Sequence, residues 1–171
     1  MAGVFSYPER MNFDLGWLGP LYLAAVTWPL IRIDISERRL PNWLTLPAIP
    51  ITVLGQILAV ALGAESWRLL IAVFAAVVAF SASLALNRYA GLGMGDVKLF
   101  TGLSMLLAWF DPALVWQASL WAFGIATAFV LVGFLAKKMT ARSTIALGPY
   151  LLIGFWLAVM PFVTSQLDVV F

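Results

Sequence analysis

Gly91-Leu92-Gly93-Met94-Gly95-Asp96-Val97-Lys98 interrupts a sequence that is otherwise close to continuous hydrocarbon. An aspartate at membrane depth costs roughly 2.5–3.5 kcal/mol on insertion scales, so it is expected to persist there only where it has a function. The neighbouring glycines let the backbone leave regular helix, which a membrane tolerates only against protein or water. The stretch therefore predicts a buried, hydrated acidic site around Asp96.

The composition on either side of this stretch predicts an all-α, polytopic membrane protein. The 171 residues are 63% hydrophobic and 11% charged, whereas globular chains average about 45–50% apolar and about 25% charged. Long apolar runs, rather than short alternating segments, favour helices over a closed barrel. The chain has no cysteine and no histidine, which excludes thiol nucleophiles, Ser-His-Asp triads, His- or Cys-based zinc sites and disulfides. We expect no metal and no cofactor.

The apolar runs predict six transmembrane helices in a single domain that covers residues 1–171. Residues 1–14 lack the features of a removable signal peptide, so we expect a short external tail. Polar residues 34–42 and glycine-rich residues 87–95 are predicted as loops, and Pro29 is predicted to kink the first helix. The predicted spans are approximately Trp17–Ile33, Leu44–Leu62, Leu69–Leu86, Asp96–Phe110, Ala113–Leu135 and Leu147–Val163.

The basic residues predict the orientation, because Lys and Arg in short loops mark the cytoplasmic side. Only Arg10 and Arg68 lie on one side of the predicted topology. Both termini are therefore expected outside, in a cytoplasmic (inner) membrane protein whose odd-numbered loops face the cytoplasm. The basic residues assigned to that side are Arg32, Arg38, Arg39, Arg88, Lys98, Lys137, Lys138 and Arg142.

Helix arithmetic gives Asp96 a partner. At a rise of about 1.5 Å per residue, Asp96 lies about 21 Å inward from Phe110, and Asp34 lies about 25 Å inward from Trp17. In a hydrocarbon core of about 30 Å, both carboxylates come to a similar depth near the cytoplasmic boundary. Two neighbouring carboxylates share a proton over a range of pH, so one can take a proton from water while the other donates to a carbonyl. This is the chemistry of an aspartic protease.

Three sequence segments resemble one known family. Gly93-Met94-Gly95-Asp96-Val97-Lys98 matches the GxGDxK signature of the prepilin peptidases, which are intramembrane aspartic proteases. Asp34-Ile-Ser-Glu-Arg-Arg-Leu-Pro-Asn-Trp-Leu-Thr45 is similar to that family's first catalytic segment. Ala146-Leu147-Gly148-Pro149-Tyr150 resembles its PxGP element, with Ala146 where proline is usual. The segments occur in the expected order and span nearly the whole chain.

The resemblance implies that Asp34 and Asp96 are the catalytic pair. It also implies a substrate, a type IV pilin-like precursor that is cut between a basic leader and an apolar helix. Larger members also methylate the new N-terminus through a cysteine-containing segment. This sequence has no cysteine, so it resembles the short Tad/Flp-type or preflagellin-type members and predicts cleavage without methylation. The supporting or substrate-binding residues implied by the motifs are Gly93, Gly95, Lys98, Pro41, Asn42, Gly148 and Pro149.

Other interpretations of these residues stand beside this one. Asp34 can be a helix-end charge paired to Arg32 or Arg38, and Asp96 can be a helix cap. Lys98 can orient Asp96 or simply extend to the interface. Pro41-Asn42 can shape the entry to the second span, with Asn42 or Thr45 capping it.

Two alternative functions remain open at this stage. A small transporter or channel could use Asp34 and Asp96 as a proton or cation relay, and an inactive scaffold could serve a secretion complex. The partners we expect are the lipid bilayer, a precursor substrate and pilus or secretion assembly proteins, without nucleic acid. Which aspartate is acid and which is base stays undetermined.

Overall fold

A computed structural model gives the structure of the chain and describes residues 15–138 and 145–168. Within these ranges the chain is all-helical, as predicted, and forms no strand. The predicted external tail (residues 1–14) and the topology signals Arg10 and Arg142 lie outside the described residues. The elements are η1 (Leu15–Trp17), α1 (Leu18–Glu37), α2 (Asn42–Thr45), α3 (Ala48–Ala61), α4 (Ser66–Ala90), α5 (Met94–Phe110), α6 (Pro112–Leu135) and α7 (Gly148–Asp168).

The helices make the described chain a multi-pass membrane protein. Four stretches are long and apolar enough to cross a bilayer: Leu15–Glu37, Asn42–Ala61, Ser66–Ala90 and Pro112–Leu135. The apolar part of α7, Gly148–Thr164, is shorter, and α5 has 17 residues. Six crossings therefore remain a prediction for α5 and α7. Large apolar side chains on the outside, such as Phe74 and Leu120, suit contact with lipid tails.

α5 lies inside the bundle, so its residues contact the other helices rather than lipid. This surrounding protein allows a helix of 17 residues to carry the charged residues Asp96 and Lys98. Val97, Leu106 and Trp109 on α5 are at most 1% exposed. α5 packs closely on α4, and α6 packs closely on α7, so the molecule contains two tight helix pairs. The second pair depends on Gly154, since a Cβ there would lie 2.7 Å from the backbone nitrogen of Ala122. Small residues allow this kind of close helix approach in membranes.

Two predicted loops are shorter than expected. The predicted polar loop began at Asp34, but α1 continues to Glu37 because no helix breaker occurs before Arg38, which ends the helix in the left-handed conformation with φ 53°. The predicted glycine loop of residues 87–95 is reduced to residues 91–93. α4 continues through Ala90, and Gly91 ends it at φ 74°. Glycine adopts such an angle without the steric cost that a Cβ brings.

The second predicted span is divided. Residues 46–47 separate α2 from α3, and Pro47 occupies the N-cap position of α3. Pro41, rather than Asn42 or Thr45, is the N-cap of α2, so the predicted side-chain cap was wrong. The Thr45 hydroxyl donates back to the Pro41 carbonyl at 3.2 Å. Pro29 lies inside α1, which is continuous through it.

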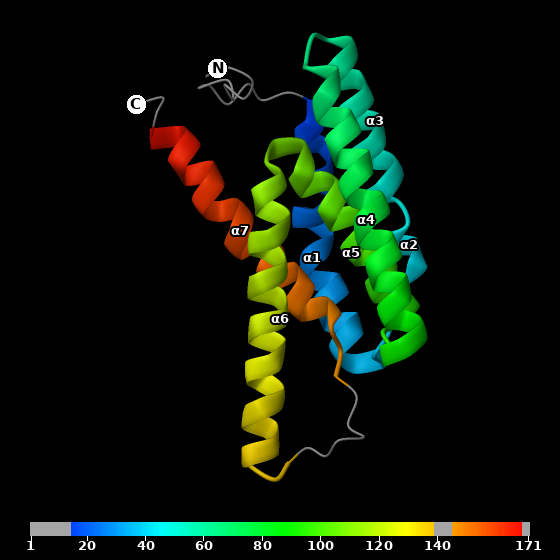
Figure 1. Ribbon diagram of the computed structural model, residues 1–171, viewed down its shortest axis with the longest axis vertical. Helices are drawn as coiled ribbons and strands as arrows, with labels where there is room; N and C mark the ends of the chain where they lie inside the picture. The colour runs from blue at the N-terminus through cyan, green and yellow to red at the C-terminus, as the bar shows by residue number, and fades with distance from the viewer. Residues whose placement is uncertain (1–14, 139–144, 169–171) are drawn as a thin grey trace.

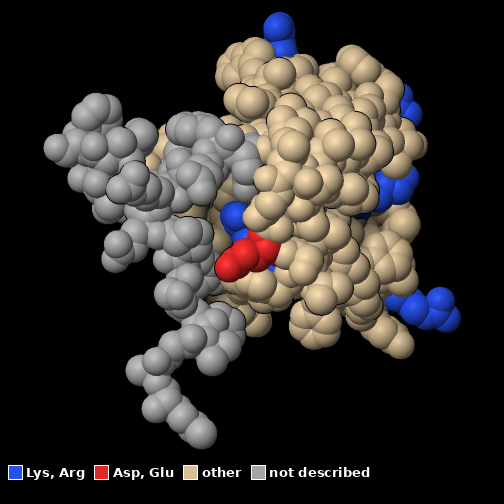
Figure 2. Space-filling model, turned by 90° about the horizontal axis from the view of Figure 1, so that it is seen from above, with Lys and Arg blue, Asp and Glu red and all other residues tan. Residues whose placement is uncertain are grey.

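The connections alternate between the two ends of the bundle. Figure 1 shows the α1–α2 connection and the α4–α5 loop at one end, and the α3–α4 and α5–α6 connections at the other. Trp17 and Phe110 lie at this second end with ring centroids 4.5 Å apart, so α1 and α5 share the common level that the helix arithmetic assumed. Viewed from there, the surface is mostly uncharged (Figure 2). The Asp34 and Asp96 segments therefore occupy the same, opposite end.

Candidate active site

Asp34 lies on the last turn of α1 and is only 3% exposed. The backbone N–H of Gly148, at the start of α7, donates to its carboxylate. A Cβ at Gly148 would lie 2.6 Å from Asp34 Oδ2, so a side chain at position 148 would displace this carboxylate. Oδ2 itself has no hydrogen-bond partner within the described part of the chain. Such an unpaired buried oxygen is uncommon and marks a position where a water or substrate group can bind.

Asp96 occupies the first turn of α5, three residues after the N-cap Gly93. Its carboxylate accepts a hydrogen bond from the Gly93 backbone N–H, as acidic or amide side chains do at this position of a capping box. A Cβ at Gly93 would lie 2.9 Å from Asp96 Oδ2, so the glycine leaves room for the carboxylate. The Asn87 amide donates to the Leu92 carbonyl and fixes the preceding turn. The predicted N-cap role of Asp96 was wrong, because Gly93 is the N-cap of α5 and Asp96 lies in its first turn with a partly exposed side chain.

Leu40 joins the two aspartate segments. A Cβ at Gly95 would lie 3.0 Å from Leu40 Cβ, and a Cβ at Gly148 would lie 3.1 Å from Leu40 Cδ2. Leu40 is 8% exposed, so it fills the space where α1, α5 and α7 converge. The carboxylates of Asp34 and Asp96 are close enough for their charges to repel each other. Leu40 was not among the predicted site residues, although an apolar residue within a polar loop was a usable signal.

Lys98 and Asn42 are also brought together. The Lys98 ammonium donates to Asn42 Oδ1 at 3.1 Å and links α5 to the first residue of α2. On the other side of α2, the Tyr22 hydroxyl donates to the Leu44 carbonyl at 2.8 Å and links it to α1. These two bonds hold α2 between the helices that carry the aspartates. Tyr22 was not among the predicted residues because its partner lies in a different segment.

The two predicted prolines shape the backbone. Pro41 precedes α2, and its carbonyl accepts from the amides of Leu44 and Thr45. Pro149 is buried in the first turn of α7, where its missing N–H costs no helical hydrogen bond. Both positions set the course of the chain beside the aspartates. No group of three or more His, Cys, Asp or Glu side chains gathers in the described part of the chain, and we assign no metal ligands.

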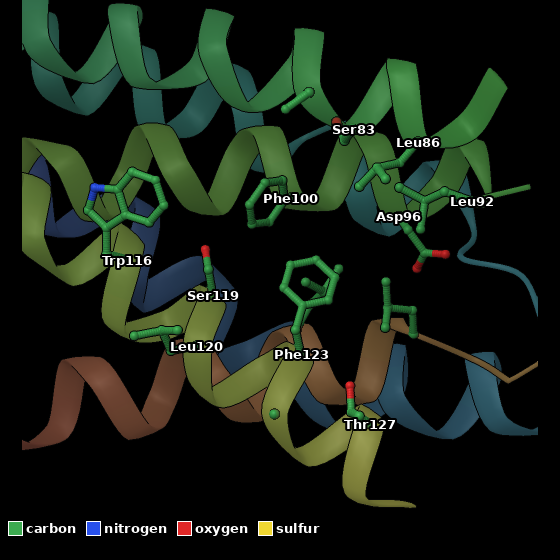
Figure 3. A pocket seen from close by; sticks show the side chains of 14 residues that line it. Ser83, Leu86, Leu92, Asp96, Phe100, Trp116, Ser119, Leu120, Phe123 and Thr127 are labelled. Carbon is green, nitrogen blue, oxygen red and sulfur yellow. The ribbon is translucent and has the colours of Figure 1, made fainter. Parts of the chain in front are cut away.

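A groove of about 620 Å³ extends from Asp96. It lies between α4 and α5 on one side and α6 on the other, with Leu147 and Leu151 contributing from the segment around the start of α7. Figure 3 shows Asp96 at one end of this groove and Trp116 at the other. Asp34 does not line it. The cluster thus combines one deeply buried carboxylate with one that borders open space.

The family model described as "Type IV leader peptidase family" matches residues 21–137, a range that includes Asp34 and Asp96. A prepilin leader peptidase/N-methyltransferase of Aeromonas hydrophila is 28% identical over 166 residues. That similarity covers 94% of this chain and 56% of the relative, so the chain spans little more than half of the relative's length. No solved structure matches the chain significantly.

Proposed function

The chain belongs to the type IV leader peptidase family, and on this basis we propose that it cleaves the basic leader from type IV pilin-like precursors as an intramembrane aspartic endopeptidase. The observation that carries this proposal is the convergence of Asp34 and Asp96 at one end of the bundle, with Leu40 between their segments. Both carboxylates lie on helix ends, so rigid elements hold them. Asp34 is the only charged side chain that is buried among the described residues.

The pair would act through a shared proton. One ionised carboxylate takes a proton from water as the water oxygen attacks the scissile carbonyl carbon. The protonated carboxylate donates to the carbonyl oxygen, and a tetrahedral diol forms without a covalent enzyme intermediate. The protonated carboxyl then donates its proton to the departing amine nitrogen while the other carboxylate takes a proton from a diol hydroxyl, so the C–N bond breaks, the new carboxyl group forms and the pair again holds one proton. The unpartnered Oδ2 of Asp34 provides an acceptor for the attacking water.

The glycines around the pair support a peptide substrate. Gly93 is exposed and Gly95 is partly exposed, and they lie three residues and one residue before Asp96. An extended peptide can therefore approach the backbone of this turn without side-chain obstruction. Gly148 and Pro149 position Asp34, while Lys98, Asn42 and Pro41 position α2. We assign these seven residues supporting roles.

We propose that the domain comprises residues 1–171, crosses the inner membrane six times and has both termini outside. The Asp34 and Asp96 end would then face the cytoplasm, where the leader of a precursor lies. The excess of basic residues at this end supports the orientation. We further propose cleavage without N-methylation, because the sequence contains no cysteine. Transfer of a methyl group by the purified protein would contradict that part.

The test is co-expression with a pilin precursor, followed by leader removal on gels. Asp34→Asn and Asp96→Asn should each reduce processing by at least about 10²–10⁴-fold, the range that acid–base catalysis supplies. Glu37→Gln is the matched control, since Glu37 is an exposed carboxylate one turn from Asp34 that pairs with Arg39. Normal processing by either asparagine variant overturns the protease assignment. Proton flux dependent on both aspartates would instead support the relay.

A further inference from the structure

The groove beside Asp96 has an extended wall on a single helix face. Six α6 residues line it at spacings of three and four, the pattern of one face of an α-helix. They extend over about 16 Å of helix, at about 1.5 Å per residue. Figure 3 shows them running from the level of Asp96 toward the far end of the groove. The residues are Trp116, Ser119, Leu120, Phe123, Gly124 and Thr127.

The opposite wall and the floor come from α4 and α5. Leu86 on α4 and Phe100 on α5 line the groove. The rings of Phe100 and Phe123 meet edge to face, with centroids 6.2 Å apart, so aromatic contact bridges the two helix pairs. Trp116 and Leu120 are 75% and 73% exposed, so the α6 wall remains open toward the bilayer. The groove therefore has a floor, two walls and a lateral opening.

Small residues on these walls indicate a helical occupant. A Cβ placed on Gly124 would meet no atom within 4 Å, so the space in front of it is empty. Ser119 also lines the groove, and its hydroxyl already donates to the Val115 carbonyl of its own helix. Ser83 is 1% exposed and lies behind the wall, where its hydroxyl donates to the Ala79 carbonyl. The walls thus offer small, polar-satisfied surfaces, which membrane helices use for close contact with one another. Fluid lipid tails need no such surfaces.

We propose that this groove seats the apolar helical segment of the precursor that follows the scissile bond. The inference rests on the proposed function, because Asp96 at the end of the groove would then meet the bond that precedes this segment. The apolar segment would enter sideways from the bilayer through the opening beside Trp116 and Leu120. Its helix would pack along the six-residue α6 face, while the peptide ahead of it unwinds over Gly93 and Gly95.

Cross-linking tests the seat directly, because the cysteine-free chain accepts single cysteines without background. Ser119→Cys lies in the groove, and Ala128→Cys is the matched control, since Ala128 is exposed on α6 but does not line the groove. Each is combined with Asp96→Asn and a pilin precursor carrying one cysteine in its apolar segment. We expect disulfide formation at position 119 at least tenfold above position 128. Equal cross-linking at both positions, or none at 119, overturns the proposal.

A kinetic experiment tests the consequence. Gly124→Trp fills the groove, whereas Ala128→Trp adds the same bulk outside it. We expect Gly124→Trp to raise the KM for the full precursor at least tenfold and to leave cleavage of a soluble peptide that spans the cut site within about twofold. Ala128→Trp should leave both reactions unchanged. Normal precursor kinetics in Gly124→Trp would overturn the groove assignment.

The two proposals fail in different ways. If the native chain cleaves no precursor, the protease assignment fails whatever the groove variants do. If the native chain cleaves the precursor but position 119 gives no selective cross-link and Gly124→Trp retains its kinetics, only the groove assignment fails. Thermal unfolding of the purified variants in detergent shows whether Gly124→Trp still folds. If it does not fold, the cross-linking of the milder Ser119→Cys variant decides whether the groove binds the apolar segment.

Discussion

Asp34 and Asp96 carry the same carboxyl group in contrasting surroundings. Asp34 is nearly inaccessible, on the last turn of α1, with the backbone of Gly148 against it. Asp96 is partly exposed, on the first turn of α5, with the groove beside it. The buried carboxylate is fixed by contacts from another helix, whereas the exposed one is fixed mainly by its own turn. A substrate that arrives from the groove would meet Asp96 first, with Asp34 behind it.

Among substitutions that test this contrast, we expect the largest loss of precursor cleavage at Gly148. Gly148→Val would place its Cβ 2.6 Å from Asp34 Oδ2 and 3.1 Å from Leu40 Cδ2, so the buried Asp34 carboxylate would have to shift. We expect precursor cleavage to fall at least about 100-fold, since a displacement of about 1 Å can cost that much. Gly102→Val is the control, because its Cβ would meet Ile49 at an ordinary 3.5 Å. Cleavage rates of purified variants check the prediction, and comparable losses at both glycines would contradict it.

Gly93 offers the matching change on the exposed side. Gly93→Ala would place a methyl group 2.9 Å from Asp96 Oδ2, but this carboxylate can turn toward the groove. We therefore expect a smaller loss, about tenfold in cleavage rate. A loss larger than that of Gly148→Val would show that the Asp96 carboxylate is held more rigidly than that of Asp34, which would contradict the proposal. The same cleavage assay measures both.

Leu40 tests whether the two surroundings depend on one another. Leu40→Ala would leave a cavity between Gly95 and Gly148, and such truncations cost about 2–5 kcal/mol of stability. We expect a lower unfolding temperature and weaker cleavage, because both aspartate segments lose their common contact. Leu40→Ile, which keeps the volume, should cost less than about 1.5 kcal/mol. Thermal unfolding in detergent separates the two, and a native-like alanine variant would show that Leu40 does not couple the segments.

The smallest effect is expected at the link between Lys98 and Asn42. The bond is exposed and measures 3.1 Å, so its contribution should be about 0.5–1.5 kcal/mol, as for a typical hydrogen bond. Lys98→Met and Asn42→Ala should each change the cleavage rate by less than about fivefold. Their combination should be no worse than the larger single effect, because both remove the same bond. A Lys98→Met variant as inactive as Asp96→Asn would instead give Lys98 a catalytic role.

The sequence was sufficient to predict the helical fold and the grouping of the aspartate segments. The apolar runs predicted the helices, and the basic residues and helix lengths predicted that Asp34 and Asp96 end at one side, which Figure 1 confirms for their segments. The close contact of Trp17 with Phe110 explains why the arithmetic succeeded. The end of α1 was predicted too early, because the polar residues after Asp34 were interpreted as a loop. Exposed polar residues are compatible with a helix, and α1 ends only where Arg38 adopts a positive φ.

Contacts between distant segments could not be predicted in the same way. An apolar residue within a polar loop indicates that Leu40 is buried, but its position between Gly95 and Gly148 depends on how three helices pack. The groove likewise arises because the α4–α5 and α6–α7 pairs meet incompletely. The groove-lining residues of α6 occur at spacings of three and four in the sequence. Because α6 is apolar on all sides, the sequence does not indicate which of its faces packs against other helices and which does not.

Cleavage kinetics of three variants decide whether Asp34 and Asp96 act as one catalytic pair. Purified Asp34→Asn, Asp96→Asn and the double variant are compared on the same precursor. If the residues act as a unit, each single variant loses at least about 10²–10⁴-fold and the double variant is no slower than the slower single one. Native-rate cleavage by either single variant, or a double variant slowed by the product of the two losses, would contradict the account.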